Sequence, residues 1–572
     1  MQDVPSESGS PGERGDAAVD AARTGGPSTL LQRSDPHATP TLWGAVFPAA
    51  SWRKVLGTRT VTLTVEGGPA SLLAARGGRL RRLGPVSGGR RELTAEELTE
   101  EWLWIEGDVR SVTWTLAEAT ELPSLCVVIP TFGRESDALA QARRFLEMEV
   151  VTSVVVVDQG GTLQHHRAFA RLLAAHDALR LVDQPNLGGS GGYARGMLEA
   201  SRDPSDAVLF SDDDAVLSEE SLRRMLTYQA LAPRPTILGT PLFSATQPTQ
   251  LTALTEAVSA FAFQWRSADR VHHAIDLAGT SPEEWTFFSP GDEANYTGWW
   301  GTLLPPGTAA DLGLPAPLFL KWDDAEYGLR ATRRGYGHAV LPGTSVHHPP
   351  WTSYRTQMTW TGRVLHRNRL AIAAAYGAGR GVLASSLLHQ AKHILSGHLL
   401  TAELWEDGID AVRTGPEGWL GDDLLHARDD GARVVDSWHR HHDLTAGQHP
   451  THGSPLPLPA ALWHSFRRML RPDGPPRVVL AVPADEMHWR TTLGGDAVLV
   501  TDDAGEVQSA FEVSGSEMRH ALARSLRSHL DLARRWPGLR DRYREELPRH
   551  TTAASWTALI AAADADDPQT RT

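Results

Sequence analysis

Four apolar runs, separated by helix-like segments, decide the fold of this chain. They are LCVVIPTF (residues 125–132), VTSVVVVDQG (151–160), LRLVDQPN (179–186) and DAVLFSDDD (206–214). Buried strands that alternate with helices indicate a mostly parallel sheet with right-handed crossovers. Ligands of such sheets bind at the carboxyl ends of the strands. We therefore expect the functional residues where these four runs end.

The sequence predicts three further regions around this α/β domain, which should cover residues 123–365. Residues 1–36 are rich in Gly, Ser, Pro and Asp with few apolar positions, so we expect a disordered tail. Residues 37–122 contain alternating stretches such as TVTLTV (60–65) between Gly-rich turns, which indicates a β-sandwich or barrel domain. A mostly helical domain is expected over residues 366–572.

Within the helical domain, we expect a strand pair near residues 477–482 and 496–500. An Arg-rich helix should cover 518–547 and break near Pro537. Its basic residues allow two interpretations: a solvated face on a packed helix, or a surface that meets anionic lipid or a lipid-linked acceptor.

Composition excludes some classes of partner and location. The 572 residues exceed one ordinary core, and the formal net charge of −14 argues against a nucleic-acid partner. The single cysteine, Cys126, favours a reducing compartment. Neither a signal-peptide core nor an apolar run of membrane-spanning length is found. These features predict a cytoplasmic protein, or one that is peripheral at the inner face of the cell membrane.

Three consecutive carboxylates, Asp212 to Asp214, follow the apolar strand AVLFS. They repel one another, and a hard divalent cation such as Mg²⁺ or Mn²⁺ relieves that repulsion and bridges to phosphates. Asp212 and Asp214 could both face such an ion, and an imidazole from His347 or His348 could complete its coordination. The alternative is an acidic helix N-terminus, because SEESL follows.

Other polar residues end the neighbouring runs. Arg134 follows the first strand, Asp158 closes the second, and Asn186 precedes the glycine-rich turn at 188–192. An acid can hold ribose hydroxyls or a base, an Arg can contact a phosphate, and glycines let the backbone approach a ligand. Together they indicate a nucleotide site.

A second cluster combines aromatic rings with acids. NYTGWW (295–300) is followed by KWDDAE (321–326) and, further on, by Trp351. Sugars pack their C–H faces on aromatic rings, so Trp299 or Trp300 suits a carbohydrate site. The alternative for each tryptophan is a place in the core.

The order of these motifs resembles that of the family 2 glycosyltransferases of the GT-A fold, whose catalytic domain has a Rossmann-like sheet. Within the family it is similar to the galactofuranosyltransferases that build mycobacterial galactan, over about residues 125–369. Pro130 to Arg134 match the family motif P-T-x-x-R. The resemblance implies that uridine diphosphate is held by Arg134, Asp158 and Asn186, with Asp213 near the ribose, and that Asp212 and Asp214 bind Mn²⁺ or Mg²⁺.

The run KWDDAEYGLRATRRGY (321–336) resembles the family's acidic motif followed by L-x-x-R-x-x-x-x-G. This implies that Asp324 is the general base and that Asp323 and Glu326 position the acceptor. The resemblance also makes His348 the third metal ligand and places Trp299 and Trp300 in the acceptor site.

The implied function is inverting, metal-dependent transfer of a sugar, with galactofuranose the best guess, in cell wall polysaccharide biosynthesis. The donor would be a UDP-sugar and the acceptor a cell-envelope glycan or a lipid-linked glycan, with a membrane contact or a homo-oligomer contact from the helical region. The alternatives are a transferase of another hexose or deoxyhexose, a nucleotidyltransferase, a two-carboxylate glycoside hydrolase, or a catalytically silent glycan-binding protein.

Overall fold

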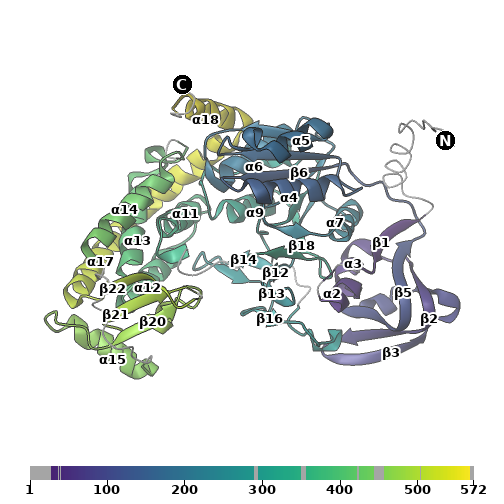
Figure 1. Cartoon of the computed structure of the whole chain (residues 1–572), viewed down its shortest axis with the longest axis horizontal. Coiled ribbons are helices and arrows are strands. Elements are labelled where there is room, and N and C mark those ends of the chain that lie inside the picture. The colour runs from purple at the N-terminus through teal and green to yellow at the C-terminus, as the bar shows by residue number, and fades with distance from the viewer. Residues whose placement is uncertain are drawn as a thin grey trace, which may run out of the picture.

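The computed structural model describes residues 28–566, apart from 36–37, 39, 289–293, 350–355, 422–423, 443–455 and 503. Most of the predicted tail and Trp351 therefore lie outside the described residues. A β-rich N-terminal part lies at one end of the molecule and a helical C-terminal part at the other, with an α/β part between them (Figure 1). The exact domain boundaries stay a prediction.

A seven-stranded mixed sheet forms the α/β part, in the order β18-β11-β17-β9-β6-β7-β8. The four strands predicted from the apolar runs pair in parallel, as expected. One strand, β17, is antiparallel to both of its neighbours. The strands are β6 (Leu125–Thr131), β7 (Ser153–Asp158), β8 (Leu179–Asp183), β9 (Ala207–Phe210), β11 (Thr236–Gly239), β17 (Thr302–Leu304) and β18 (Gly337–Val340).

Helices cover both faces of this sheet, which explains why its strands are apolar without alternation. Val127 and Ile129 of β6 face one core, whereas Cys126 and Val128 face the other. The first core is closed by α4 (Glu135–Leu146), α5 (Arg167–Ala175) and α7 (Glu219–Leu231). The second is closed by α6 (Gly188–Ala200), α9 (Asp323–Arg333) and α18 (Ala553–Asp566), while α8 (Thr308–Leu312) is a short connection.

A second sheet brings distant segments to the end of the first. Its order is β10-β19-β12-β13-β16, and β10 pairs antiparallel with β19. Beside it lies the hairpin β14 (Glu256–Val258) and β15 (Trp265–Ser267). The strands of the second sheet are β10 (Val216–Leu217), β12 (Leu242–Ser244), β13 (Gln250–Ala253), β16 (Ile275–Asp276) and β19 (Val346–His348).

The N-terminal part contains one bent five-stranded antiparallel sheet, so its predicted β-rich character is observed. The strand pairing gives one sheet rather than a sandwich of two. The predicted tail is wrong for Thr29–Arg33, which forms β1, because these residues pair with β5 and bury Leu31. The elements are β1, α2 (Thr41–Ala45), α3 (Ala49–Leu56), β2 (Val61–Arg76), β3 (Arg79–Pro85), β4 (Arg90–Leu93) and β5 (Trp102–Leu116).

The C-terminal part is mostly helical and includes the predicted strand pair, β20 and β21, which is parallel. Its helices pack on one another through the core that contains Leu370, Ile409 and Trp536. The elements are α11 (Thr361–Ala375), α12 (Gly381–Leu395), α13 (Leu399–Thr414), α14 (Ala427–His442), α15 (Leu458–Met469), α16 (Trp489–Thr492), β20 (Val479–Pro483), β21 (Ala497–Thr501), β22 (Val507–Glu512) and α17.

The predicted break near Pro537 is wrong, because α17 runs without interruption from Gly515 to Glu546. Trp536 and Leu539, on either side of the proline, are buried against the other helices, and this packing holds the helix together. On α17, Arg535 pairs with Asp531, which also pairs with Arg413 of α13. Among the described residues, no helix is long and apolar enough to cross a membrane.

Candidate active site

The predicted site residues gather at the carboxyl ends of β6, β7, β8 and β9. Arg134 follows β6 and Asn186 follows β8, while Asp212 to Asp214 follow β9. The Nη1 atom of Arg134 lies 2.7 Å from Oδ2 of Asp214 and 3.4 Å from Oδ1 of Asp213. Residues from two separate strand ends therefore contact one another directly.

Asp212, Asp214 and His348 form a group whose ligand atoms all lie within 4.8 Å of one another. Nε2 of His348 is 3.1 Å from Oδ1 of Asp214 and 3.6 Å from Oδ2 of Asp212. On the other side of the ring, Nδ1 lies 2.6 Å from the carbonyl oxygen of Pro349. A carbonyl can only accept, so Nδ1 carries the proton and Nε2 is the ring atom that faces Asp212 and Asp214.

The electrostatics of this group fit a divalent cation. Burial raises the pKa of Asp212, although His348 and Tyr193 oppose the shift. Burial also raises the pKa of Asp213 to about 6, despite the hydrogen bond from Thr131. Two acids and one imidazole around a single point suit Mn²⁺, and Mg²⁺ in the same place would keep more water ligands.

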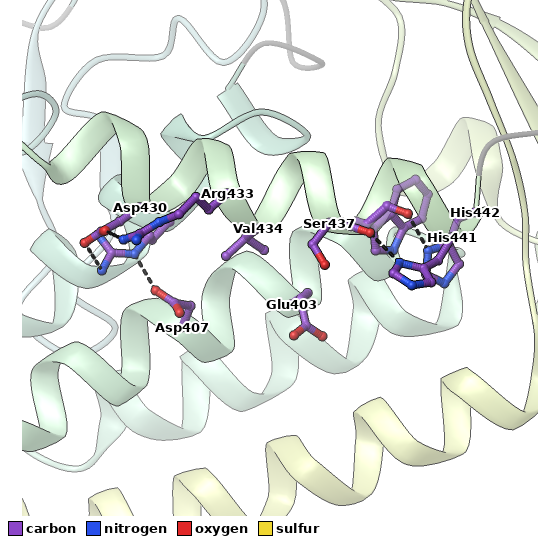
Figure 2. A pocket seen from close by; sticks show the side chains of 10 residues that line it. Glu403, Asp407, Asp430, Arg433, Val434, Ser437, His441 and His442 are labelled. Atoms are coloured by element: carbon purple, nitrogen blue, oxygen red, sulfur yellow. Dashed lines mark hydrogen bonds and ion pairs between the residues drawn. The ribbon is translucent and has the colours of Figure 1, made fainter.

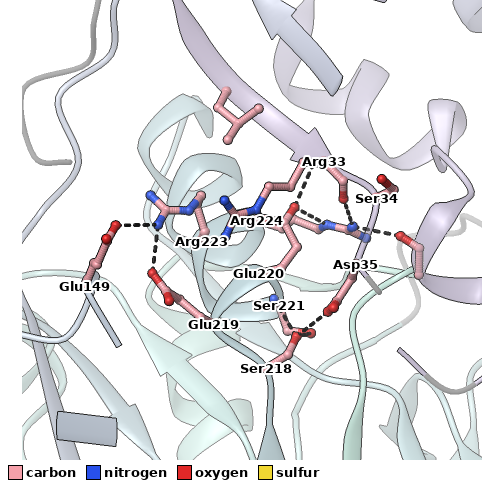
Figure 3. A network of polar contacts seen from close by, with 12 residues as sticks. Arg33, Ser34, Asp35, Glu149, Ser218, Glu219, Glu220, Ser221, Arg223 and Arg224 are labelled. Atoms are coloured by element: carbon pink, nitrogen blue, oxygen red, sulfur yellow. Dashed lines mark hydrogen bonds and ion pairs between the residues drawn. The ribbon is translucent and has the colours of Figure 1, made fainter. Parts of the chain in front are cut away.

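A buried polar network around Arg33, Glu220 and Arg224 lies between the N-terminal part and α7 (Figure 3). The Arg224 guanidinium, 1% exposed, donates 2.8 Å hydrogen bonds to the carbonyl oxygens of Gly343, before β19, and of Gly44. Its Nε donates to Glu220, which also accepts from Nε of Arg33 at 2.9 Å. Through Arg224, the N-terminal part is therefore joined to the segment before β19, the strand that carries His348.

An open cavity of about 980 Å³ lies beside the strand ends and is lined by Gly133, Gln159, Gly160 and Asn186 among others. Asn186 accepts a hydrogen bond from the N–H of Gly188, whose φ of +70° and contact with Phe319 exclude a side chain. This cavity has the position expected of a nucleotide pocket.

Asp158 lies differently from the expectation. Its carboxylate is fully buried and accepts from the N–H groups of Gly160, at 3.0 Å, and Leu163, at 2.7 Å. It therefore shapes the loop that lines the cavity. Gln159, which sequence reasoning missed, lines the cavity and accepts from the N–H of Leu187 at 2.9 Å.

A second hollow, of about 570 Å³, lies between α13 and α14 (Figure 2). Its charged side chains pair with one another: Arg363 contacts Asp407 and Asp430, and Arg433 also contacts Asp430. The strand-end cavity lies at the same edge of the sheet as Asp214, because Gly133, which lines it, directly precedes Arg134, whose guanidinium contacts Asp214.

The acidic motif lies at the start of α9, where the backbone is strained. Phe319, Lys321 and Trp322 have φ values of 69°, 66° and 72°. Such conformations cost on the order of 1–3 kcal/mol each and concentrate at functional sites. Burial raises the pKa of Asp324 to about 6, and the charge of Asp212 contributes to this shift. The acidic motif is therefore electrostatically coupled to the group of Asp212, Asp214 and His348, below called the metal group. Burial, together with the charge of Asp324, also raises the pKa of Asp323.

Two residues of the predicted acceptor set are engaged inside the protein. Glu326 is 2% exposed, pairs with Arg330 and accepts from the hydroxyl of Tyr376 at 2.9 Å. Trp299 is buried, with its ring centroid 5.1 Å from that of Tyr193. Both side chains therefore pack inside the protein.

Trp300 is half-buried and its Nε1 donates to the carbonyl oxygen of Thr240 at 3.2 Å. The structure also brings in residues that sequence reasoning missed. Tyr193 donates to Asp212 at 2.8 Å, and Glu256 lies close enough to Asp324 that burial and this charge raise its pKa to about 8. Trp265, 38% exposed, stacks on Trp322. A lone Glu or Trp in a loop-rich stretch gives no sequence signal.

Comparison with known proteins agrees with this geometry. Residues 123–371 match the model of the glycosyltransferase like family 2. The chain is 29% identical over 565 residues to galactofuranosyltransferase GlfT2 of Mycolicibacterium smegmatis, covering 90% of this chain and 87% of the relative. It is also 29% identical over 572 residues to galactofuranosyltransferase GlfT2 of Mycobacterium tuberculosis, covering 91% and 89%.

Among solved structures, a mannosyltransferase from Pyrobaculum calidifontis in complex with GDP-Man and Mn²⁺ is 14% identical. It covers 56% of this chain and 84% of its own, with a TM-score of 0.33, which is too low to bear on the chemistry. The family match and the two relatives, in contrast, span the strand-end site. The chain is therefore a glycosyltransferase, and its residues 123–371 are similar to the glycosyltransferase like family 2.

Proposed function

We propose that the chain transfers galactofuranose from UDP-galactofuranose to a cell-envelope or lipid-linked glycan, with inversion and with a divalent metal ion. The observation that carries this proposal is the group of Asp212, Asp214 and His348 next to Asp324 at one end of the sheet. The choice of sugar rests on the identity to two galactofuranosyltransferases over about nine tenths of the chain.

The donor would bind along the strand ends. Gly133, Gly160 and Asn186 line the cavity that would take the nucleotide, and Asp213 would lie toward the ribose. Arg134 would exchange its contact with Asp214 for the diphosphate, whose charged oxygens can accept two hydrogen bonds from the planar guanidinium. Mn²⁺ or Mg²⁺, held by Asp212, Asp214 and His348, would offset the negative charge of the leaving diphosphate.

Asp324 is the group that would take the proton from the acceptor hydroxyl. The oxygen of the acceptor hydroxyl then bonds to the anomeric carbon while the bond from that carbon to the diphosphate breaks. One such displacement inverts the configuration. A pKa of about 6 leaves Asp324 ionised at neutral pH and still basic enough to accept a proton. Asp323, whose pKa is raised, would hold the acceptor by donating a hydrogen bond.

The peripheral membrane contact is best supported by α15. This helix buries Ala461 and Ser465, whereas Trp463 is 62% exposed and Phe466 is 50% exposed. Arg467, beside Phe466, is also exposed. Exposed aromatic residues next to arginine suit the interface of an anionic bilayer. Cosedimentation with phosphatidylglycerol vesicles should fall in Trp463→Glu, whereas a change in oligomeric state without vesicle binding would assign this face to a second copy of the chain.

Released UDP tests the reaction. Purified protein with Mn²⁺ is given a panel of UDP-sugars, including UDP-galactofuranose, with Asp324→Asn as the matched variant. We expect metal-dependent release from UDP-galactofuranose that is lost in the variant. Release from a different donor would change the sugar, and UDP binding without release from any donor would favour a silent glycan-binding protein.

A further inference from the structure

Two strained turns lie against each other next to the acidic motif, and helix α11 holds both. Among the residues that the structure describes, four non-glycine residues have positive φ values. Three of them lie in the turn at 319–322 that leads into Asp323 and Asp324, and the fourth, Phe263, has a φ of 50° in the turn of the β14–β15 hairpin. Such strain persists only where the surroundings enforce it.

The turn at 319–322 is held by one buried amide from α11. Nδ2 of Asn368, whose side chain is fully buried, lies 2.9 Å from the carbonyl oxygen of Leu318 and 3.0 Å from those of Leu320 and Lys321. Nε of Arg367 donates to Oδ1 of Asn368 at 3.1 Å. This contact fixes the orientation of the amide, so that its N–H groups face the turn.

The next residue on α11 holds the other turn. Nε of Arg369 donates to the carbonyl oxygen of Phe263 at 2.8 Å, and Nη2 donates to that of Ala262 at 2.7 Å. The ring of Phe263 stacks on Trp322, with centroids 5.5 Å apart. Two consecutive side chains therefore fix two turns that also pack on each other.

We propose that Asn368 is a positioning residue for Asp324: it holds the strained turn that presents this carboxylate to the acceptor. The proposal rests on the proposed role of Asp324 as the base. Asn368 does not itself line the nucleotide cavity, although Phe319 of the turn does, so its loss should lower the rate of the chemical step far more than it weakens donor binding. A displacement of the base of about 1 Å can lower the rate about 100-fold.

The test compares Asn368→Ala with a matched control, Gln390→Ala. Gln390 is an equally buried amide on α12 that donates to Ala402 and Glu406, far along the chain from both turns. Both variants should lower Tm, but only Asn368→Ala should lower kcat, by roughly 10- to 100-fold, with a much smaller change in the Kd for UDP. Asn368→Ser keeps one donor and should fall between the wild type and the alanine variant.

A double variant distinguishes positioning from general damage. If Asn368 acts through Asp324, Asn368→Ala should cause no further loss of the residual rate that a long assay at high enzyme concentration detects in the Asp324→Asn background. The acid limb of kcat/KM should also move to lower pH in Asn368→Ala, because a loosened turn exposes the carboxylate. Equal losses of kcat in Asn368→Ala and Gln390→Ala, or additive losses in the double variant, would overturn the proposal, whereas full activity in Asp324→Asn alone would overturn the proposed base.

Discussion

Replacement of Glu326 by Gln separates a supporting role from an acceptor-binding role. Glu326 is 2% exposed and pairs with Arg330, whose Nη1 also donates to the carbonyl oxygens of Leu312 and Leu314. Breaking a buried pair by removing one charge costs about 3–5 kcal/mol, because the other charge stays buried. At roughly 2–4 °C per kcal/mol, a loss of about 3 kcal/mol lowers Tm by roughly 6–12 °C.

The assay is thermal unfolding together with steady-state kinetics below the unfolding range. The control is Glu219→Gln, which breaks a pair of the same i,i+4 spacing with Arg223 that is more exposed, with Glu219 25% accessible. That variant should cost less than about 1 kcal/mol. An unchanged Tm in Glu326→Gln, combined with a tenfold rise in the acceptor KM, would refute this reasoning and place Glu326 in the acceptor site.

Three further predictions concern the core, the base and the metal. Trp299→Ala should destabilise the protein by about 3–5 kcal/mol in urea unfolding, because the ring packs on Tyr193 and Phe210. A variant of unchanged stability with a raised KM for the acceptor would contradict a core role for Trp299. The acid limb of kcat/KM should lie near pH 6, since Asp324 must lose its proton to act as the base; a profile that stays flat to pH 4.5 would exclude it. EDTA should abolish UDP release, and Mn²⁺ at about 100 times its Kd should restore it and stabilise the protein by about 2.7 kcal/mol; activity that survives EDTA would argue against the metal group.

Much of the sheet and of the metal group could be predicted from the sequence. Valine-rich runs that alternate with helices predict a sheet covered by helices on both faces. Asp212 and Asp214 directly follow one of these strands, so the sequence also predicts their place at the end of the sheet. The sequence also marked His348, which β19 brings to these acids from over a hundred residues away.

Three predicted site residues are buried by partners that no local sequence pattern reveals. Glu326 turns inward because Arg330 and Tyr376 meet it there, and Asp158 turns toward the N–H groups of its own loop. Trp299 occupies the core because its ring packs against the ring of Tyr193. Each outcome follows from tertiary packing, which decides whether a polar or aromatic side chain faces the cavity or supports it.

The configuration of the transferred sugar tests the central claim most directly. Wild-type protein with Mn²⁺, UDP-galactofuranose and a short galactofuranosyl acceptor is analysed by NMR of the anomeric proton of the product. The proposed single displacement predicts a new glycosidic bond whose anomeric configuration is opposite to that of the donor, and no such product from Asp324→Asn in the same assay time. A product with retained configuration, or equal product from the variant, would contradict a single displacement assisted by Asp324.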